Sequence, residues 1–240
     1  MQVDSKGNTP LHAALRQFRA PLVRQMLQVS TVEPLRPDSD GSSALHHLAR
    51  HLYIESRKDD ADTIAAQHLI TTFMGLDVDI NARNGNGDTP LHSHIRNAEF
   101  SRPHSGSWGV RSDNHSALST LDPNEGLRFM LAQGADPFAR NNAGETVLHL
   151  MAARPTIVGY SRFNREDTSE RASRLFKSLV KLGLDPMDED ERQRTSLDIA
   201  AANQNDGVLK LFERDVEPWV PLPDITSLLA AWPIVKMYLC

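Results

Sequence analysis

The chain has 240 residues, of which 40% are hydrophobic and 24% are charged, and its formal net charge is -5 at pH 7. This size and hydrophobic fraction suffice for a substantial buried core, as one domain or one repeat array. The modest negative charge gives no support to nucleic-acid binding, so we expect no nucleic-acid partner.

Cysteine usage and hydropathy limit the compartment. The only cysteine, Cys240, excludes an internal disulfide framework and favours a reducing compartment, so we expect an intracellular protein, cytoplasmic or nuclear. The first residues contain no apolar run typical of a secretory signal. No stretch of about 18 apolar residues occurs, so we expect no membrane insertion.

A four-residue phrase, Thr-Pro-Leu-His in its fullest form, recurs along the chain. Its copies occupy residues 9–12, 43–46, 89–92, 146–149 and 195–198, and in four of the five a glycine stands two residues earlier. A phrase that recurs with its own turn residue predicts a repeat array. The function of an array usually resides in a surface rather than in a pocket.

The third copy indicates how one unit folds. Residues 79–88 are rich in Asn, Asp and Gly, which build tight turns. Thr89 suits the N-cap of a helix and Pro90 its first position. Leu91 and Ile95 lie four apart and share one face of that helix.

A second amphipathic helix is predicted over residues 125–133, where Leu127, Met130 and Leu131 form a stripe and Gly134 follows as the C-terminal residue. The unit is therefore a turn, a helix, a loop and a second helix. Neither helix is long enough to be stable alone, so neighbouring units must stack. In the other units the second helix is expected over residues 21–28, 61–74, 169–182 and 206–214.

The pattern resembles the ankyrin repeat family. The residues that carry the resemblance are the turn with Asp4 and Gly7 before Thr9-Pro10-Leu11-His12-Ala13-Ala14, Gly134-Ala135-Asp136 after the second helix, and Asn81 at the family's Asn position. The fifth copy departs from the pattern, with Asp198 in place of His and no turn glycine, and the second has Ser43-Ala44 in place of Thr-Pro. The resemblance implies an all-α, ankyrin-type solenoid of helix–loop–helix units joined by β-turn or hairpin loops.

The resemblance covers an array over residues 1–215, with units at about 3–36, 37–82, 83–139, 140–189 and 190–215. Residues 216–240 are expected to form a C-terminal cap or a degenerate sixth repeat. The first unit begins almost at Met1 with no polar helix before it, and arrays need capped ends. Either the exposed face of the first unit is polar enough, or the chain is a piece of a longer protein; the abrupt start favours a fragment or a truncated gene product.

The spacing of the phrase predicts three insertions. Successive copies are 34, 46, 57 and 49 residues apart, whereas ankyrin units repeat about every 33 residues. The excess falls between the first and second helices of units 2, 3 and 4, at about residues 51–62, 97–123 and 154–168. Equivalent loops on stacked units emerge on one edge, so the insertions are expected to form one accessory surface. Their aromatic residues, among them Trp108 and Tyr160, are candidate binding anchors if exposed and otherwise cover the helix ends.

The sequence predicts neither catalysis nor the binding of a cofactor or metal. We predict no catalytic, cofactor-binding or metal-binding residue, because no nucleophile elbow, P-loop, Rossmann glycine pattern or HExxH is present. The resemblance implies that His12, His46, His92 and His149 bond the helix start and the neighbouring turn. His47, His51 and His94 remain as weak metal candidates without a cysteine partner.

The favoured function is a non-catalytic protein–protein interaction module, a scaffold or adaptor that acts as a monomer on another protein. The alternative is a regulatory or substrate-recruiting segment of a larger multidomain protein or enzyme. The binding residues are expected at the turn tips, the first helices and the insert edge: Lys6, Asn8, Asn84, Asn86, Asp88, Asn142, Glu145, Arg192, Arg194, Trp108 and Tyr160.

Overall fold

The computed structural model describes residues 3–29, 32–52, 56–57, 61–97, 121–122, 124–154 and 165–213. Over these ranges the chain is helical, in agreement with the all-α prediction, apart from one short strand pair. Each recurring phrase starts a short first helix: α1 (Pro10–Arg16), α3 (Ala44–Ala49), α5 (Pro90–Asn97), α7 (Val147–Ala152) and α9 (Ser196–Ala202). The second helices are α2 (Ala20–Leu27), α4 (Ala61–Met74), α6 (Glu125–Ala132), α8 (Arg165–Lys181) and α10 (Asp206–Glu213).

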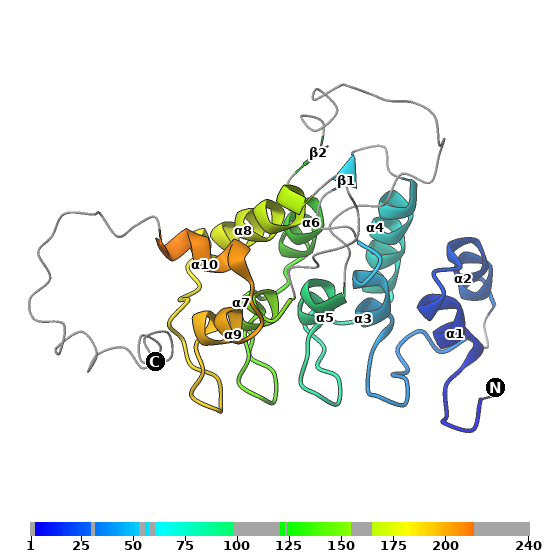
Figure 1. Ribbon diagram of the computed structural model, residues 1–240. Helices are drawn as coiled ribbons and strands as arrows, with labels where there is room; N and C mark the ends of the chain where they lie inside the picture. The colour runs from blue at the N-terminus through cyan, green and yellow to red at the C-terminus, as the bar shows by residue number, and fades with distance from the viewer. Residues whose placement is uncertain are drawn as a thin grey trace, which may run out of the picture.

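The helices stack as pairs in chain order. Each first helix contacts its own second helix and the first helix of the next unit. Figure 1 shows the result as two rows of helices, with the first helices below the second and five loops projecting together from the lower side. These five segments, residues 4–8, 38–42, 84–88, 141–145 and 190–194, are called the turn loops below.

The first helices begin where the phrase predicts because its polar residues cap them. In α1 the Thr9 hydroxyl accepts from the backbone N–H of His12, while the Thr9 N–H donates to the His12 ring. The same reciprocal capping box starts α3, α7 and α9. In α9, Asp198 takes the place of histidine, and its carboxylate accepts from the Thr195 N–H at 2.8 Å.

The core runs between the two rows. The leucine of the phrase is buried in the first four units, at Leu11, Leu45, Leu91 and Leu148, and half-buried in the fifth, at Leu197. Each fully buried leucine stabilises the fold by about 1.5–3 kcal/mol relative to exposure. In the second row, Phe73 of α4 and Phe176 of α8 are the largest fully buried side chains.

The second helices agree with prediction in part. The bounds of α4 are those expected, whereas α8 begins at Arg165, four residues before the expected 169. The third insertion is therefore shorter than the spacing suggested. Residues 155–164 and 214–240, including Tyr160 and the expected C-terminal cap, lie outside the described residues, as does Trp108.

A two-residue strand pair joins the first two insertions. Strand β1 (Ser56–Arg57) pairs antiparallel with β2 (Leu121–Asp122), with Ser56 opposite Asp122 and Arg57 opposite Leu121. Figure 1 places the pair beside α4 and α6, on the opposite side of the stack from the turn loops. The expected clustering of insertions on one edge is confirmed for these two.

Neighbouring turn loops approach so closely that glycine is required at several positions, of which Gly87 is the tightest. Gly87 has a φ of +72°, and a Cβ there would lie 2.7 Å from the backbone nitrogen of Asn142 in the next loop. Gly134, at the end of α6, also has a positive φ of +89° but has no atom within 4 Å of such a Cβ.

We expect G87A to lower the free energy of unfolding by about 3 kcal/mol, because it adds a clash between loops to left-handed strain. G134A supplies the matched control and should cost only the strain, about 1–2 kcal/mol. Urea unfolding of both variants and the parent checks this. Equal losses would show that the loops do not pack as closely as described.

Candidate functional site

Every turn loop is held by the side chain that begins it. The Oδ1 atom of that Asp or Asn accepts the backbone N–H groups two and four residues later; for Asp38 these are Asp40 and Ser42, both at 2.9 Å. The same pair of bonds forms in all five loops, from Asp4, Asp38, Asn84, Asn141 and Asp190. The loops therefore share one backbone shape, and their tips present different side chains from equivalent positions.

The loops are tied to one another through the backbone. The N–H of Gly85 donates to the carbonyl of Asp40 at 2.8 Å, and the N–H of Asn142 donates to Asn86 at 2.9 Å. Glu191 and Ala143 repeat this bond between the fourth and fifth loops. The first junction differs, because Ser39 N–H donates instead to the side-chain oxygen of Asn8 at 3.0 Å.

The histidines of the phrase link each first helix to the next unit. Each accepts the N-cap N–H at Nδ1, so the Nε2–H is free to donate to a backbone carbonyl farther along the chain. His46 donates to Asp88 at 2.8 Å and His92 to Glu145 at 3.2 Å. His12 and His149 reach Arg36 and Arg194. The structural role expected for these four histidines is confirmed.

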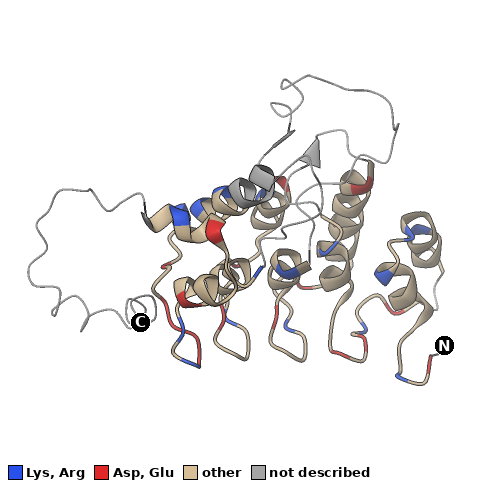
Figure 2. Cartoon of the chain, in the orientation of Figure 1, with Lys and Arg blue, Asp and Glu red and all other residues tan. Residues whose placement is uncertain are grey.

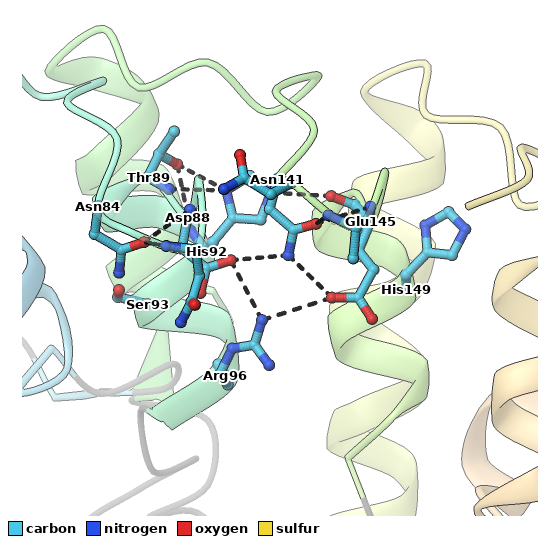
Figure 3. Close-up of polar contacts among 12 residues, drawn as sticks. Asn84, Asp88, Thr89, His92, Ser93, Arg96, Asn141, Glu145 and His149 are labelled. Atoms are coloured by element: carbon cyan, nitrogen blue, oxygen red, sulfur yellow. Dashed lines mark hydrogen bonds and ion pairs between the residues drawn. The ribbon is translucent and has the colours of Figure 1, made fainter. Parts of the chain in front are cut away.

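A chain of charged side chains crosses the third and fourth units (Figure 3). The Asp88 carboxylate accepts from Asn141 at 2.9 Å and from Arg96 at 3.3 Å. Glu145 accepts from the same Asn141 at 2.9 Å and lies 3.6 Å from Arg96. Arg194 continues the chain, 3.8 Å from Glu145 and 2.6 Å from Asp190. The acids in this chain are consequently engaged within the protein.

A buried acid anchors the second unit. Burial alone would raise the pKa of Asp38, but hydrogen bonds from Arg16 and from the N–H groups of Ser42 and Asp40 outweigh it and lower the pKa to about 2. His47 donates its Nε2–H to Asp38 at 2.9 Å. Burial lowers the pKa of His47 to about 4, so the ring is neutral at pH 7 despite the adjacent carboxylate.

A polar hollow of about 240 Å³ opens between the turn loops and the first helices of units 1 to 3. It is lined by Arg16, Asp38, Asp40, Ser42, His46, His47, Arg50, Asn84, Asn86, Asp88, Ser93, Arg96 and Asn97. Figure 2 shows acidic and basic residues interspersed on the turn loops, so neither sign of charge dominates this side.

The structure divides the predicted binding residues into groups. Lys6, Asn86, Asn142 and Arg192 are exposed on the turn loops, although Asn142 also donates to the carbonyl of Gly85 at 3.1 Å. Asn84, Glu145 and Arg194 are half-buried and hydrogen-bonded within the stack. Asn8 and Asp88 are buried, because their side chains fill the spaces between adjacent loops. They are therefore not part of the candidate binding surface. Trp108 and Tyr160 lie outside the described residues.

Sequence reasoning missed several residues of the hollow. Arg16, Arg50 and Arg96 each follow the capping residue of their unit by seven positions. This register was available in the sequence and places the three side chains on equivalent points of successive first helices. The partners that hold Arg16 and Arg96 could not all be found in the same way, because Asp38 and Glu145 belong to the neighbouring unit, whereas Asp88, 3.3 Å from Arg96, belongs to its own.

Two of the other histidines considered as metal candidates have structural surroundings. His51 stacks on Phe18 with ring centroids 4.6 Å apart, and His94 is fully buried, with Nδ1 3.0 Å from the carbonyl of Ala49. Within the described ranges, no group of three or more His, Cys, Asp or Glu side chains could hold a metal ion. Helices long and apolar enough to cross a membrane are likewise absent from the part of the chain that the structure describes.

Comparison with known proteins gives one partial similarity. A stretch of 94 residues, 39% of this chain, is 29% identical to a probable serine/threonine-protein kinase of Dictyostelium discoideum. The chain spans about 10% of the length of that kinase. No protein-family model matches the chain.

Buried His94 gives a pH prediction. Burial lowers its pKa from 6.5 to about 4. Between these values the unfolded chain binds a proton that the folded chain does not, so stability is lost as pH falls from 7 toward 4. At pH 5 the loss from this residue is about 2 kcal/mol.

H94N keeps a donor for the Ala49 carbonyl but does not titrate, so we expect a smaller difference in unfolding free energy between pH 7 and pH 5 than in the parent. Urea unfolding at both pH values measures it. H68N, at an exposed position of α4, is the matched control and should retain the parent's difference. An H94N difference as large as the parent's would rule out His94 as the titrating group.

Proposed function

We propose that this chain is an ankyrin-type array that acts as a non-catalytic protein–protein interaction module. The observation that carries the proposal is the set of five turn loops with one backbone shape and different tips. Lys6, Asp40, Asn86, Ala143 and Arg192 occupy the same position in their loops, three residues before the capping residue. An extended row of variable side chains on a fixed frame suits recognition of another protein.

The tip side chains are available to a partner. Lys6, Asn86 and Arg192 are exposed, and their side chains make no hydrogen bond or ion pair with the described residues. By contrast, several side chains that link one unit to the next are buried: Asn8, Asp88, Asn141 and the four phrase histidines. This separation allows the tips to change without loss of the fold. The edge of the stack that carries the insertions, near β1 and β2, is a second candidate binding surface.

We further propose that the protein is intracellular and monomeric. The lone cysteine is its support for a reducing compartment. The partner is another protein, and no cofactor is assigned.

The triple variant K6A/N86A/R192A tests the tips. We expect several-fold lower recovery of captured proteins, quantified by mass spectrometry after affinity purification, with an unchanged melting temperature because no frame contact is removed. R24A/Q28A/K177A removes the same number of charges from exposed positions of α2 and α8 and should retain the parent's recovery. Recovery that the tip substitutions leave unchanged would contradict the proposal.

A second candidate is a regulatory or substrate-recruiting segment of a larger protein. Its support is the similarity to a short part of a probable serine/threonine-protein kinase. An immunoblot of the native source with antibodies to residues 61–97 tests it. A band well above 26.7 kDa is expected under this candidate, whereas a single band at that mass would remove it.

A further inference from the structure

We propose that the polar hollow of units 1 to 3 receives a carboxylate from an acidic segment of a partner protein, with Arg50 as its principal contact. The inference rests on the proposed interaction function and adds the chemistry of what is bound. It starts from the Arg16, Arg50 and Arg96 register. The first helices at whose ends these residues lie pack against one another in sequence, α1 on α3 and α3 on α5, and all three arginines line the hollow.

The two outer arginines are already paired. Arg16 donates to the buried Asp38 at 2.9 Å, and Arg96 lies 3.3 Å from Asp88 and 3.6 Å from Glu145. Arg50 is exposed, and within the described part of the chain its side chain makes no hydrogen bond or ion pair. A guanidinium group that lines a hollow with all its donors unused is suited to an incoming carboxylate, which accepts two parallel N–H bonds.

A second unused donor lies in the same hollow. Ser93 is only 7% exposed, lines the hollow, and its hydroxyl makes no hydrogen bond with the described residues. Its oxygen reaches the open space of the hollow, where a ligand can contact it. Figure 3 labels Ser93 and Arg96, which both lie on α5. A bound carboxylate oxygen would give this hydroxyl an acceptor in place of solvent.

The neighbouring histidine does not compete. His47 stands in unit 2 at the position that Ser93 holds in unit 3, and its Nε2–H is committed to Asp38. Its other neighbours are Arg16 and His12, which face it from α1. The ring is uncharged at pH 7, so it neither repels nor attracts the ligand.

One acidic residue of the hollow, Asp40, repels an anionic ligand and so bears on which anion can bind. Asp40 is exposed at the tip of its loop and also lines the hollow. Asp38 and Asp88 are neutralised by their arginines, so Arg50 and Asp40 remain as the unmatched charges among the lining residues. A phosphate group carries about -1.5 to -2 charges, so Arg50 attracts it and Asp40 repels it more strongly than either acts on a carboxylate. Arg50 is the one unmatched cation among the lining residues, and a single carboxylate, with one charge and two parallel acceptor oxygens, is the ligand that one guanidinium group neutralises.

The test uses the full chain and labelled Gly/Ser peptides that bear one Glu, Gln or phosphoserine residue, with fluorescence anisotropy at low ionic strength. We expect the Glu peptide to bind more tightly than the Gln and phosphoserine peptides. R50Q should weaken Glu-peptide binding by about two- to fivefold and S93A by a similar factor, whereas D40N should strengthen it. R24Q, which removes an exposed arginine of α2, should change nothing.

Several results would overturn the inference: no preference for Glu over Gln, tighter binding of the phosphoserine peptide, or an R50Q variant that binds as the parent does. Side-chain Nε–H signals of arginine in NMR spectra supply a second measurement, because the Arg50 signal should shift on titration. Protein capture that survives R50Q but is lost in K6A/N86A/R192A would overturn this inference alone. Capture that survives the triple variant would overturn the proposed function.

Discussion

One imidazole ring in each of the first four units makes the contacts on which the starts of the first helices and the positions of the turn loops depend. Its Nδ1 atom accepts the N–H that begins a first helix, and its Nε2–H donates to a backbone carbonyl of the following segment. One side chain thus sets where a helix starts and where the next turn lies. The ring must stay uncharged to do both, and burial lowers the pKa of His46, His92 and His149, which favours that state.

Where sequence reasoning succeeded, the determinants were local. The capping residue, the phrase histidine and the turn glycine all lie within a few positions of one another, so the starts of the first helices were predictable. The start of α8 was not, because residues 165–168 are polar or charged and lack the apolar stripe on which the prediction relied. The strand pair β1–β2 joins segments 65 residues apart, and neither segment has a sequence pattern that predicts the pairing.

The candidate site was harder to predict, since a polar residue in a turn can face solvent or a neighbouring unit. Asn8 and Asp88 carry the same kind of side chain as the exposed Asn86. Only the position of the adjacent loop decides between these outcomes, and that loop is 30 or more residues away. The seven-residue spacing of the arginines from their capping residues can be read from the sequence. The unpaired state of Arg50 cannot, because it depends on Arg16 and Arg96 holding Asp38 and Asp88.

The first junction has a consequence for how the stack responds to stress. From the second loop onward, adjacent loops are tied by backbone bonds, and a substitution removes the donor of such a bond only if it introduces proline. Between the first and second loops the tie is the side chain of Asn8. Under mechanical load or slow warming, we therefore expect the N-terminal helix pair to detach first, and substitution of Asn8 should make that detachment easier.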